Sequence, residues 1–512
     1  MTLSFPRALL ARGLDAAPAL IEAGATTSYR ELRARVRELA GALSAAGLAR
    51  GDRVALVGET SAWIVAAYLA AMVAGGVAVP LPPALAASKL ESLLSRAGAR
   101  FALSARSCAD TVRVAASAGS LERLWIEPVA AEPAEAVAVG VTGERGRPAP
   151  IAADLAAILF TSGSTGVPRG VMVSHANLLA NTDAIALALA LGARDRALLV
   201  LPWHYCFGAS VIHTHLRVGG SVAIGPQLGY AERVLDTLES THATGLYGVP
   251  STFLHLLARS SLAERELSGL RYVAQAGGRL SEPALRALTR LRGKPEVYLM
   301  YGQTEATARL SVLPPARLAE RFGSIGRGLP GGRLFAGEPS WPPTRLEVVT
   351  EEGVPAAPGQ LGEIVARGPG ITRGYLGDPD ETGAFFRDGG LRTGDLGTAD
   401  ADGYITIRGR EREFIKVAGV RVSATEIEEA LLAHPGVADA AVMAVPDPVT
   451  GEAVAAHVVA CSGGELRRAD ILAHCRQRLG GESVPRHVRQ WDALPRTPSG
   501  KVARAELVLD AR

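Results

Sequence analysis

The sequence predicts an α/β protein in which a large N-terminal domain of layered α/β subdomains and a β-rich subdomain precedes a small, mobile α+β domain. Three observations carry this prediction. The chain has 512 residues, short apolar segments alternate with amphipathic ones over its first three quarters, and the pattern changes near residue 409. A chain of this length buries a large core and normally forms more than one domain. Alternating strands and helices are typical of α/β layers.

The N-terminal part alternates apolar segments with helical periodicity. Strands are predicted at 53–58, 77–81, 197–202, 221–225 and 296–302, and helices at 29–47 and 282–293. The run from Ser61 to Ser88 carries no charge, so a membrane span is one alternative. Gly75 and Pro80 favour a helix of about a dozen residues followed by a short buried strand instead. Ala, Pro and Gly dominate residues 114–154, which predicts surface loops.

The C-terminal part changes character at Gly409. Short strands are predicted before it, at 362–375 and 403–410. After it come a helix that starts with a capping box of Ser423 and Glu426, two strands at 438–447 and 452–460, and a helix at 467–480. We therefore expect a large N-terminal domain over 1–409 and a small domain over 410–512.

Composition excludes several function classes. The net charge is +3 without a Lys/Arg block, which argues against nucleic-acid binding. The N-terminus does not have the pattern of a secretion signal, and the four cysteines lack metal-ligand spacing, so we expect free thiols in a reducing cytoplasm. A metal pair at His213 and His215 is an alternative that lacks further ligands nearby. Only four of the 54 basic residues are lysines: Lys89, Lys294, Lys416 and Lys501.

Four segments suggest nucleotide chemistry. "TSGSTGVPRG" (161–170) offers four hydroxyls and three glycines to phosphate oxygens, but it departs from the common phosphate loop and has Arg169 where a Lys is usual. "YGQTE" (301–305) places a carboxylate after a strand, where it can hold Mg²⁺. "LRTGDLG" (391–397) and "PRTPSGKVAR" (495–504) contain Asp395 and Lys501. Each segment alone also fits a surface loop, a turn or a solvated tail.

Taken in this order, the segments resemble the adenylate-forming superfamily of acyl- and aryl-CoA synthetases, nonribosomal peptide adenylation domains and luciferases. The resemblance covers nearly the whole chain. It extends to "TSYRELRARVRELAGAL", "VAGGVAVPL", "GLYGVPST", "AGGRL", "GEIVARGPGITRGY" and "GREREFIKVAGVRVSATEIEEAL". It implies that a carboxylate attacks the α-phosphate of ATP, so that an acyl-adenylate and pyrophosphate form. Catalysis would then consist mainly of positioning and charge neutralisation.

The resemblance also implies site residues. The outer phosphates would contact Thr161, Ser162, Gly163, Ser164, Thr165, Gly166 and Arg169. The nucleoside would contact Gly277, Gly278, Tyr301, Gly302, Asp395 and Arg410, with Asp395 on the ribose. Thr304 would touch the α-phosphate, Glu305 would bind Mg²⁺ with Thr165 as a possible second ligand, and Lys501 would be the catalytic lysine. Arg169 is interpreted as a tolerated replacement, because an Arg fork can neutralise phosphate charge.

The acid pocket is expected in "LPWHYCFGASVIHTH" (201–215), at Trp203, His204, Tyr205, Phe207 and Gly208. In amino-acid-activating relatives an Asp that pairs with the α-ammonium falls at Gly208, so an acyl or aryl acid is favoured over an α-amino acid. The resemblance implies a hinge at Arg412, about which the small domain turns to bring Lys416 and Gly419 to the acyl-adenylate. A thiol of CoA or of phosphopantetheine on a separate carrier protein would then attack.

Two other functions stay open. One is an adenylating enzyme whose product is not a thioester, such as one that couples amines, oxidises the adenylate or activates a small inorganic acid such as nitrite. The other is a non-catalytic nucleotide-binding relative. We expect a cytoplasmic protein without a membrane span, and a homodimer is a possible state.

Overall fold

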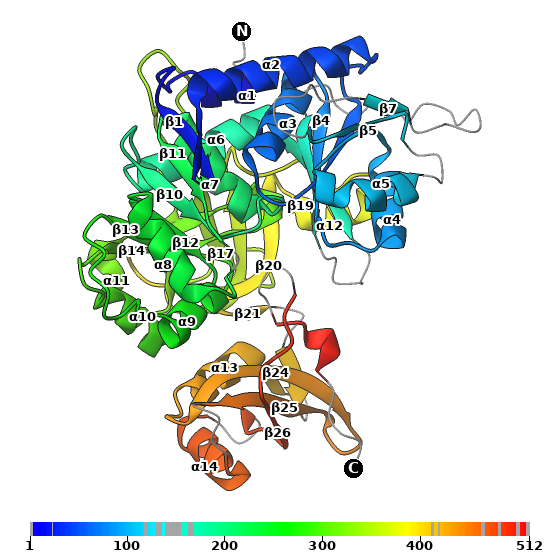
Figure 1. Cartoon of the computed structure of the whole chain (residues 1–512). Coiled ribbons are helices and arrows are strands. Elements are labelled where there is room, and N and C mark those ends of the chain that lie inside the picture. The colour runs from blue at the N-terminus through cyan, green and yellow to red at the C-terminus, as the bar shows by residue number, and fades with distance from the viewer. Residues whose placement is uncertain are drawn as a thin grey trace.

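The computed structural model describes residues 4–22, 24–116, 121–128, 136–138, 155–161, 168–226, 228–410, 414–417, 420–461, 466–479, 483–497 and 502–507. These residues form a large N-terminal domain, which contains two β-sheets, and a small C-terminal domain built on a third sheet (Figure 1). The predicted α/β class and the order of a large and a small domain are confirmed.

In the described residues, the first sheet has seven strands in the order β7-β6-β5-β3-β4-β8-β9. They are β3 (Arg53–Val57), β4 (Val77–Leu81), β5 (Ala99–Ser104), β6 (Arg123–Ile126), β7 (Ala136–Ala138), β8 (Leu155–Thr161) and β9 (Arg169–Ser174). The central strands are parallel and buried, which explains why they appear as continuous apolar runs. Helices α4 (Ala87–Ala97) and α5 (Ala109–Ala116) pack on one face.

The second sheet has 14 strands within the described residues. Its parallel part contains β1 (Pro18–Glu22), β10 (Arg196–Leu199), β11 (Ser221–Ile224), β12 (Gly245–Gly248), β13 (Tyr272–Gln275) and β14 (Glu296–Tyr301), with β2 (Ala25–Ser28) antiparallel at one edge. Its antiparallel part contains β15 (Ser311–Leu313), β16 (Ser324–Gly328), β17 (Arg345–Val349), β18 (Gly362–Arg367), β19 (Phe386–Arg387), β20 (Gly390–Ala399) and β21 (Ile405–Arg410). This second part is the predicted β-rich region.

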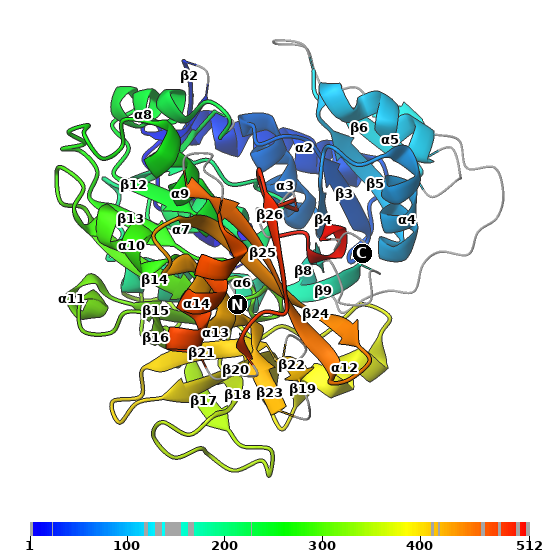
Figure 2. The same ribbon diagram turned by 90° about the horizontal axis from the view of Figure 1, so that it is seen from below.

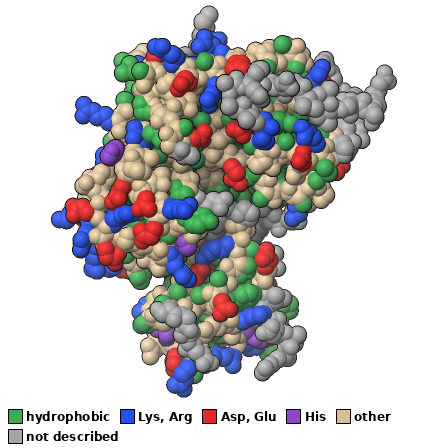
Figure 3. All heavy atoms as spheres, in the orientation of Figure 1, with side chains coloured by type: hydrophobic (Ala, Val, Ile, Leu, Met, Phe, Trp, Pro, Cys, Tyr) green, Lys and Arg blue, Asp and Glu red, His purple; other side chains and the backbone are tan. Residues whose placement is uncertain are grey.

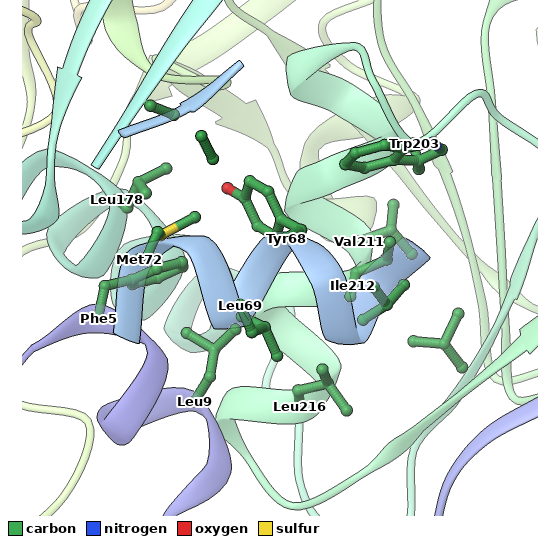
Figure 4. Packing of buried hydrophobic residues seen from close by; sticks show 14 of the residues in the cluster. Phe5, Leu9, Tyr68, Leu69, Met72, Leu178, Trp203, Val211, Ile212 and Leu216 are labelled. Carbon is green, nitrogen blue, oxygen red and sulfur yellow. The ribbon is translucent and has the colours of Figure 1, made fainter. Parts of the chain in front are cut away.

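Helices fill the space between the two sheets. They are α1 (Phe5–Leu10), α2 (Tyr29–Ala45), α3 (Ala62–Val73), α6 (His175–Ala188) and α7 (Cys206–Arg217). Figure 4 shows Tyr68, Leu69 and Met72 of α3 packed between residues of α1 and α7. On the outer face of the second sheet lie α8 (Ala231–Ser240), α9 (Pro250–Arg259) and α10 (Glu282–Thr289). The domain is therefore a stack of helix and sheet layers.

The uncharged run from Ser61 to Ser88 belongs to this core. Eleven residues of α3, Ala62 through Met72, are buried, and β4 continues the run into the first sheet. Among the described helices, none is long and apolar enough to cross a membrane. The alternative of a membrane span in this run is therefore wrong.

Two local predictions need correction. Residues 114–154 are not loop throughout, because α5 extends to Ala116 and β6 joins the first sheet with Trp125 buried. The aromatic and apolar residues of 123–126 are too few for a periodic signal, so packing decides their conformation. The helix predicted at 282–293 is α10, which is shorter than predicted and ends at Thr289.

The C-terminal domain contains the sheet β23-β22-β25-β24, with β26 parallel to β25. Its elements are β22 (Phe414–Val417), β23 (Val420–Ser423), α13 (Ala424–Leu432), β24 (Val437–Asp447), β25 (Gly451–Ala460), α14 (Arg468–Arg478) and β26 (His487–Trp491). Ser423 caps α13 by accepting a bond from the Glu426 N–H at 3.2 Å. The chain changes sheets between Arg410 and Phe414.

The two domains are in contact at α13. Arg279 of the large domain forms an ion pair with Glu429 of α13. Next to it a cavity of about 310 Å³ lies between α9 and α10 on one side and Leu432, Val437 and Ala438 on the other. Figure 2, which views the molecule from below, shows the small domain in front of the large one. Figure 3 shows charges of both signs mixed over the visible face.

Candidate active site

The predicted phosphate loop connects two paired strands. Thr161 ends β8, Arg169 begins β9, and the two residues lie opposite each other in the antiparallel pair. Ser162, Gly163, Ser164, Thr165 and Gly166, which make up the loop between them, lie outside the described residues.

Arg169 is held at the base of this loop. Its Nη2 lies 2.8 Å from Glu381 Oε1, and its side chain is 10% exposed. The guanidinium also lies over the ring of Tyr375, 5.4 Å from the centroid. An arginine in this setting is fixed by an ion pair and an aromatic face at once.

Glu305 is oriented by residues far away in the sequence. The hydroxyl of Tyr375 donates to Glu305 Oε1 at 2.9 Å, and the N–H and hydroxyl of Thr372 donate to the Glu305 carbonyl at 3.0 and 2.8 Å. Burial and the Glu305 charge raise the pKa of Tyr375, so the hydroxyl stays protonated. The carboxylate therefore has a fixed direction.

The "YGQTE" turn carries backbone strain. Thr307 has φ of 69° although it is not glycine, and its hydroxyl anchors it to the Gly370 carbonyl at 2.7 Å. Gly302 has no room for a side chain, since a Cβ would lie 2.1 Å from the Ala308 carbonyl oxygen. Such conformations persist where the surroundings enforce them, and they concentrate at functional sites.

Asp395, Tyr301 and Arg410 form one cluster. Asp395 Oδ2 accepts from the Tyr301 hydroxyl at 2.5 Å, and Oδ1 accepts from Arg410 Nε at 2.9 Å. Asp395 and Arg410 face each other on β20 and β21. Burial, then the Asp395 charge, raises the pKa of Tyr301 well above its usual range. The structure thus brings three of the predicted nucleoside contacts together.

Gly277 and Gly278 follow β13 and are exposed. Gly277 has φ of +84°, and a Cβ there would lie 3.0 Å from Val249 Cγ1. A ligand can therefore approach this backbone closely beside the "GLYGVPST" segment.

The predicted acid pocket surrounds the start of α7. Trp203 is 1% exposed and donates from Nε1 to the Gly58 carbonyl at 2.8 Å. Burial lowers the pKa of His204 to about 4, so this imidazole is neutral near pH 7. Tyr205 is the N-cap residue of α7, and its ring centroid lies 4.4 Å from that of His204.

The next residues connect the pocket to the "YGQTE" turn. Cys206 Sγ lies 3.5 Å from Thr304 Oγ1, so the acid pocket and the predicted α-phosphate contact are adjacent. A Cβ on Gly208 would lie 2.2 Å from the Pro202 carbonyl oxygen. This position has no space for any side chain, including the Asp of amino-acid-activating relatives.

Some predicted residues cannot be placed. Arg412, Gly419 and Lys501 lie outside the described residues, and for Lys416 only the backbone in β22 is described. His213 stacks on Tyr68, whereas His215 Nε2 lies 2.9 Å from the Tyr272 hydroxyl. In the described part of the chain, no group of three or more potential ligands could hold a metal ion.

Three residues that contact predicted site residues were not predicted from the sequence: Tyr375, Cys206 and Arg309. Tyr375 is in a segment that was recognised, but its partner Glu305 is 70 positions away. Arg309 is four residues after "YGQTE", and its burial among aromatic rings gives no local sequence signal.

Comparison with known proteins agrees with the geometry. Residues 10–376 match the AMP-binding enzyme family and residues 426–501 match the AMP-binding enzyme C-terminal domain. The chain belongs to the family of AMP-binding enzymes. The predicted membership of the adenylate-forming superfamily is confirmed, and so is the prediction of an AMP-forming ligase of the acyl-CoA synthetase type.

Individual relatives cover almost the whole chain. A feruloyl-CoA synthase from an Amycolatopsis species is 33% identical over 494 residues, 96% of this chain and 95% of that protein. The fatty acid–[acyl-carrier-protein] ligase ScoC from Streptomyces coeruleorubidus is 31% identical over 506 residues, 96% and 92% of the two chains. The structure of the amide bond synthetase McbA from Marinactinospora thermotolerans superposes with a TM-score of 0.84 at 28% identity, over 98% of each chain.

Proposed function

We propose that this enzyme joins a carboxylic acid to AMP, with release of pyrophosphate, and then transfers the acyl group to a thiol. The observation that carries this proposal is the cluster of Tyr301, Asp395 and Arg410 at the "YGQTE" turn, whose Thr304 contacts Cys206 at the start of α7. The carboxylate oxygen attacks the α-phosphorus in line, and pyrophosphate leaves. The protein contributes position and compensating charge rather than covalent chemistry.

The residues divide this work. Asp395 accepts from the ribose hydroxyls, Gly277 and Gly278 border the base, and Thr304 donates to the α-phosphate. The loop 161–166 and Arg169 hold the outer phosphates, and Arg169 has a second role because it also contacts Tyr375. Lys501 neutralises charge between the carboxylate and the α-phosphate as the bond forms.

The site fits Mg²⁺ at Glu305. Among the described residues no cation pairs with this carboxylate, and its only side-chain partner is the neutral hydroxyl of Tyr375. Oxygen ligands from one or two protein groups, completed by phosphate oxygens, are what Mg²⁺ normally takes. Bound there, the ion would neutralise phosphate charge, and Thr165 is the proposed second ligand.

The acid is an acyl or aryl acid and not an α-amino acid. An ammonium group beside α7 would lack a carboxylate partner, because Gly208 cannot be replaced by Asp without moving Pro202. An unpaired buried charge costs several kcal/mol by an order-of-magnitude estimate. The neutral His204 supplies no charge to the pocket.

The acceptor is the thiol of CoA or of a phosphopantetheine on a separate carrier protein. The names of the relatives support this range, since they include one CoA synthase and one acyl-carrier-protein ligase. We propose that the small domain, 410–512, turns about Arg412 to bring Lys416 and Gly419 to the acyl-adenylate. Four free cysteines support a reducing, cytoplasmic location.

The alternative is amide formation, which is supported by the similarity to an amide bond synthetase. One experiment separates the candidates. ATP–pyrophosphate exchange across a broad panel of acids identifies the acid, and product analysis with CoA, with a carrier protein and with amines identifies the acceptor. If none of the acids in the panel supports exchange, the result would contradict acid activation and favour a non-catalytic nucleotide-binding protein.

A further inference from the structure

Arg309 is a buried cation that has no counter-ion in the described part of the chain. Its side chain follows the "YGQTE" turn and is 1% exposed. Among the residues that the structure describes, no carboxylate lies within ion-pair distance of it, and its Nε and Nη2 have no hydrogen-bond partner. Its one side-chain hydrogen bond runs from Nη1 to Ser210 Oγ at 3.0 Å.

Arg217 shows what an ordinary buried arginine looks like in this fold. It is 0% exposed, its Nε lies 2.7 Å from Asp183 Oδ1, and Glu338 pairs with its other edge. Buried charges are paired in this way because an isolated charge in the interior is strongly unfavourable. Among the described residues, Arg309 has the burial of Arg217 without its pairing, so its Nε and Nη2 can pair with a group that a ligand supplies.

The surroundings hold Arg309 beside Phe207, a residue of the predicted acid pocket. Asn181 clamps its backbone, with Nδ2 donating to the Arg309 carbonyl at 2.7 Å and Oδ1 accepting from the Arg309 N–H at 3.3 Å. The guanidinium lies 4.5 Å from the ring centroid of Phe207 and 5.7 Å from that of Tyr247. Two aromatic faces thus hold the cation in place without neutralising it.

The position relative to the reacting carboxylate follows from α7. Cys206 contacts Thr304 at the α-phosphate end of the pocket, whereas Phe207 and Ser210 contact Arg309. Cys206 and Ser210 are four residues apart, which corresponds to about 6 Å along the helix axis. The bond to Ser210 therefore places the Arg309 guanidinium about one turn of α7 away from the α-phosphate end.

We propose that Arg309 is a specificity-determining residue that pairs with a second anionic group, a carboxylate or a sulfonate, at the far end of the acid substrate. This inference rests on the proposed acid activation and adds the class of acid. A planar guanidinium with two free donors matches the two oxygens of such a group. The preferred substrates are short acids with a second oxyanion.

The test compares acids that differ only in the second charge. ATP–pyrophosphate exchange is measured with dicarboxylic acids from malonate to adipate and with the monoamide of each, which keeps length and shape. The native enzyme should prefer a diacid over its monoamide. Arg309→Met should lower that preference about 100-fold or more, and Arg309→Lys should keep part of it. Arg37→Met, on the exposed side of α2, is the matched control and should keep it in full.

A binding measurement gives a readout that does not depend on turnover. The preferred diacid should raise the unfolding temperature of the native protein and of Arg309→Lys, but not that of Arg309→Met. An unchanged ratio between diacid and monoamide in Arg309→Met would overturn the role of Arg309 and leave acid activation standing. Equal losses with every acid in a folded Arg309→Met would also overturn it, since Arg309 would then serve the reacting carboxylate. Absence of exchange with any acid in the native enzyme would instead contradict the proposed function.

Discussion

Removal of the Tyr375 hydroxyl tests whether a distant residue positions Glu305, the proposed Mg²⁺ ligand. Tyr375→Phe deletes the bond to Glu305 Oε1, which is 2.9 Å long and partly buried. A hydrogen bond to a charged group contributes about 1.5–3 kcal/mol, which corresponds to about 10- to 150-fold in an equilibrium constant. We expect kcat/KM for ATP–pyrophosphate exchange to fall by about this factor. The Mg²⁺ concentration at half-maximal rate should rise, because a free carboxylate samples several rotamers.

The chain offers a matched control. Tyr298 donates to Glu296 Oε2 at 3.0 Å near the start of β14, at the opposite end of the strand from the site. Tyr298→Phe removes the same chemical bond, and we expect the Mg²⁺ dependence to stay unchanged. If Tyr375→Phe also leaves the Mg²⁺ dependence unchanged, or if both variants shift it equally, the bond to Glu305 does not position the metal ligand.

Three further predictions concern the proposed catalytic lysine, the proposed acid pocket and the core. Lys501→Ala should abolish pyrophosphate exchange but spare thioester formation from a supplied acyl-adenylate; equal loss of both steps would contradict the two-step division. Gly208→Ala should lower stability by about 1–3 kcal/mol in chemical denaturation, because its Cβ meets the Pro202 carbonyl. The control Gly41→Ala, in open space on α2, should stabilise slightly, and a stable Gly208→Ala would refute the clash. Burial lowers the pKa of His213 to about 3, so between about pH 6.5 and this value the unfolded chain binds a proton that the folded one does not. The free energy of unfolding should therefore decrease as the pH is lowered through that window. His213→Phe should flatten this slope near pH 5 by about 1.4 kcal/mol per pH unit. An unchanged slope would show that His213 does not titrate on unfolding.

The elements with strong local signals were predictable from the sequence. The capping box of Ser28 and Glu31 starts α2 within the predicted range 29–47, and the buried parallel strands appear as short apolar runs. Strand β6 was missed because four residues give no period, and its conformation depends on pairing with β5. Local chemistry defines elements, whereas sheet neighbours are decided by packing over the whole domain.

The sequence could predict those site residues that belong to a local motif, but not the contacts between motifs. Asp395 and Arg410 were assigned to one task, and the structure shows them bonded across β20 and β21. The bond between Tyr375 and Glu305 spans 70 positions, and the contact between Cys206 and Thr304 spans 98. Such contacts leave no periodic or spacing signal, so a single sequence cannot reveal them. The pairing of Arg169 with Glu381 is of the same kind.

Gly208 and Arg309 both disfavour acids that carry an ammonium group, and each does so for a different physical reason. Gly208 leaves no space for the carboxylate that an α-ammonium would need, since its Cβ position lies 2.2 Å from a backbone oxygen. Arg309 places a cation at the deep end of the pocket, where an ammonium would be repelled and an oxyanion attracted. Replacing one of the two therefore cannot convert the enzyme to an amino-acid ligase. A Gly208→Asp variant that folded would present its new carboxylate to the pocket that contains Arg309, and the two would pair with each other before any substrate entered. A buried guanidinium without a counter-ion among the described residues therefore disfavours substrates with a cationic group and favours substrates with an anionic one.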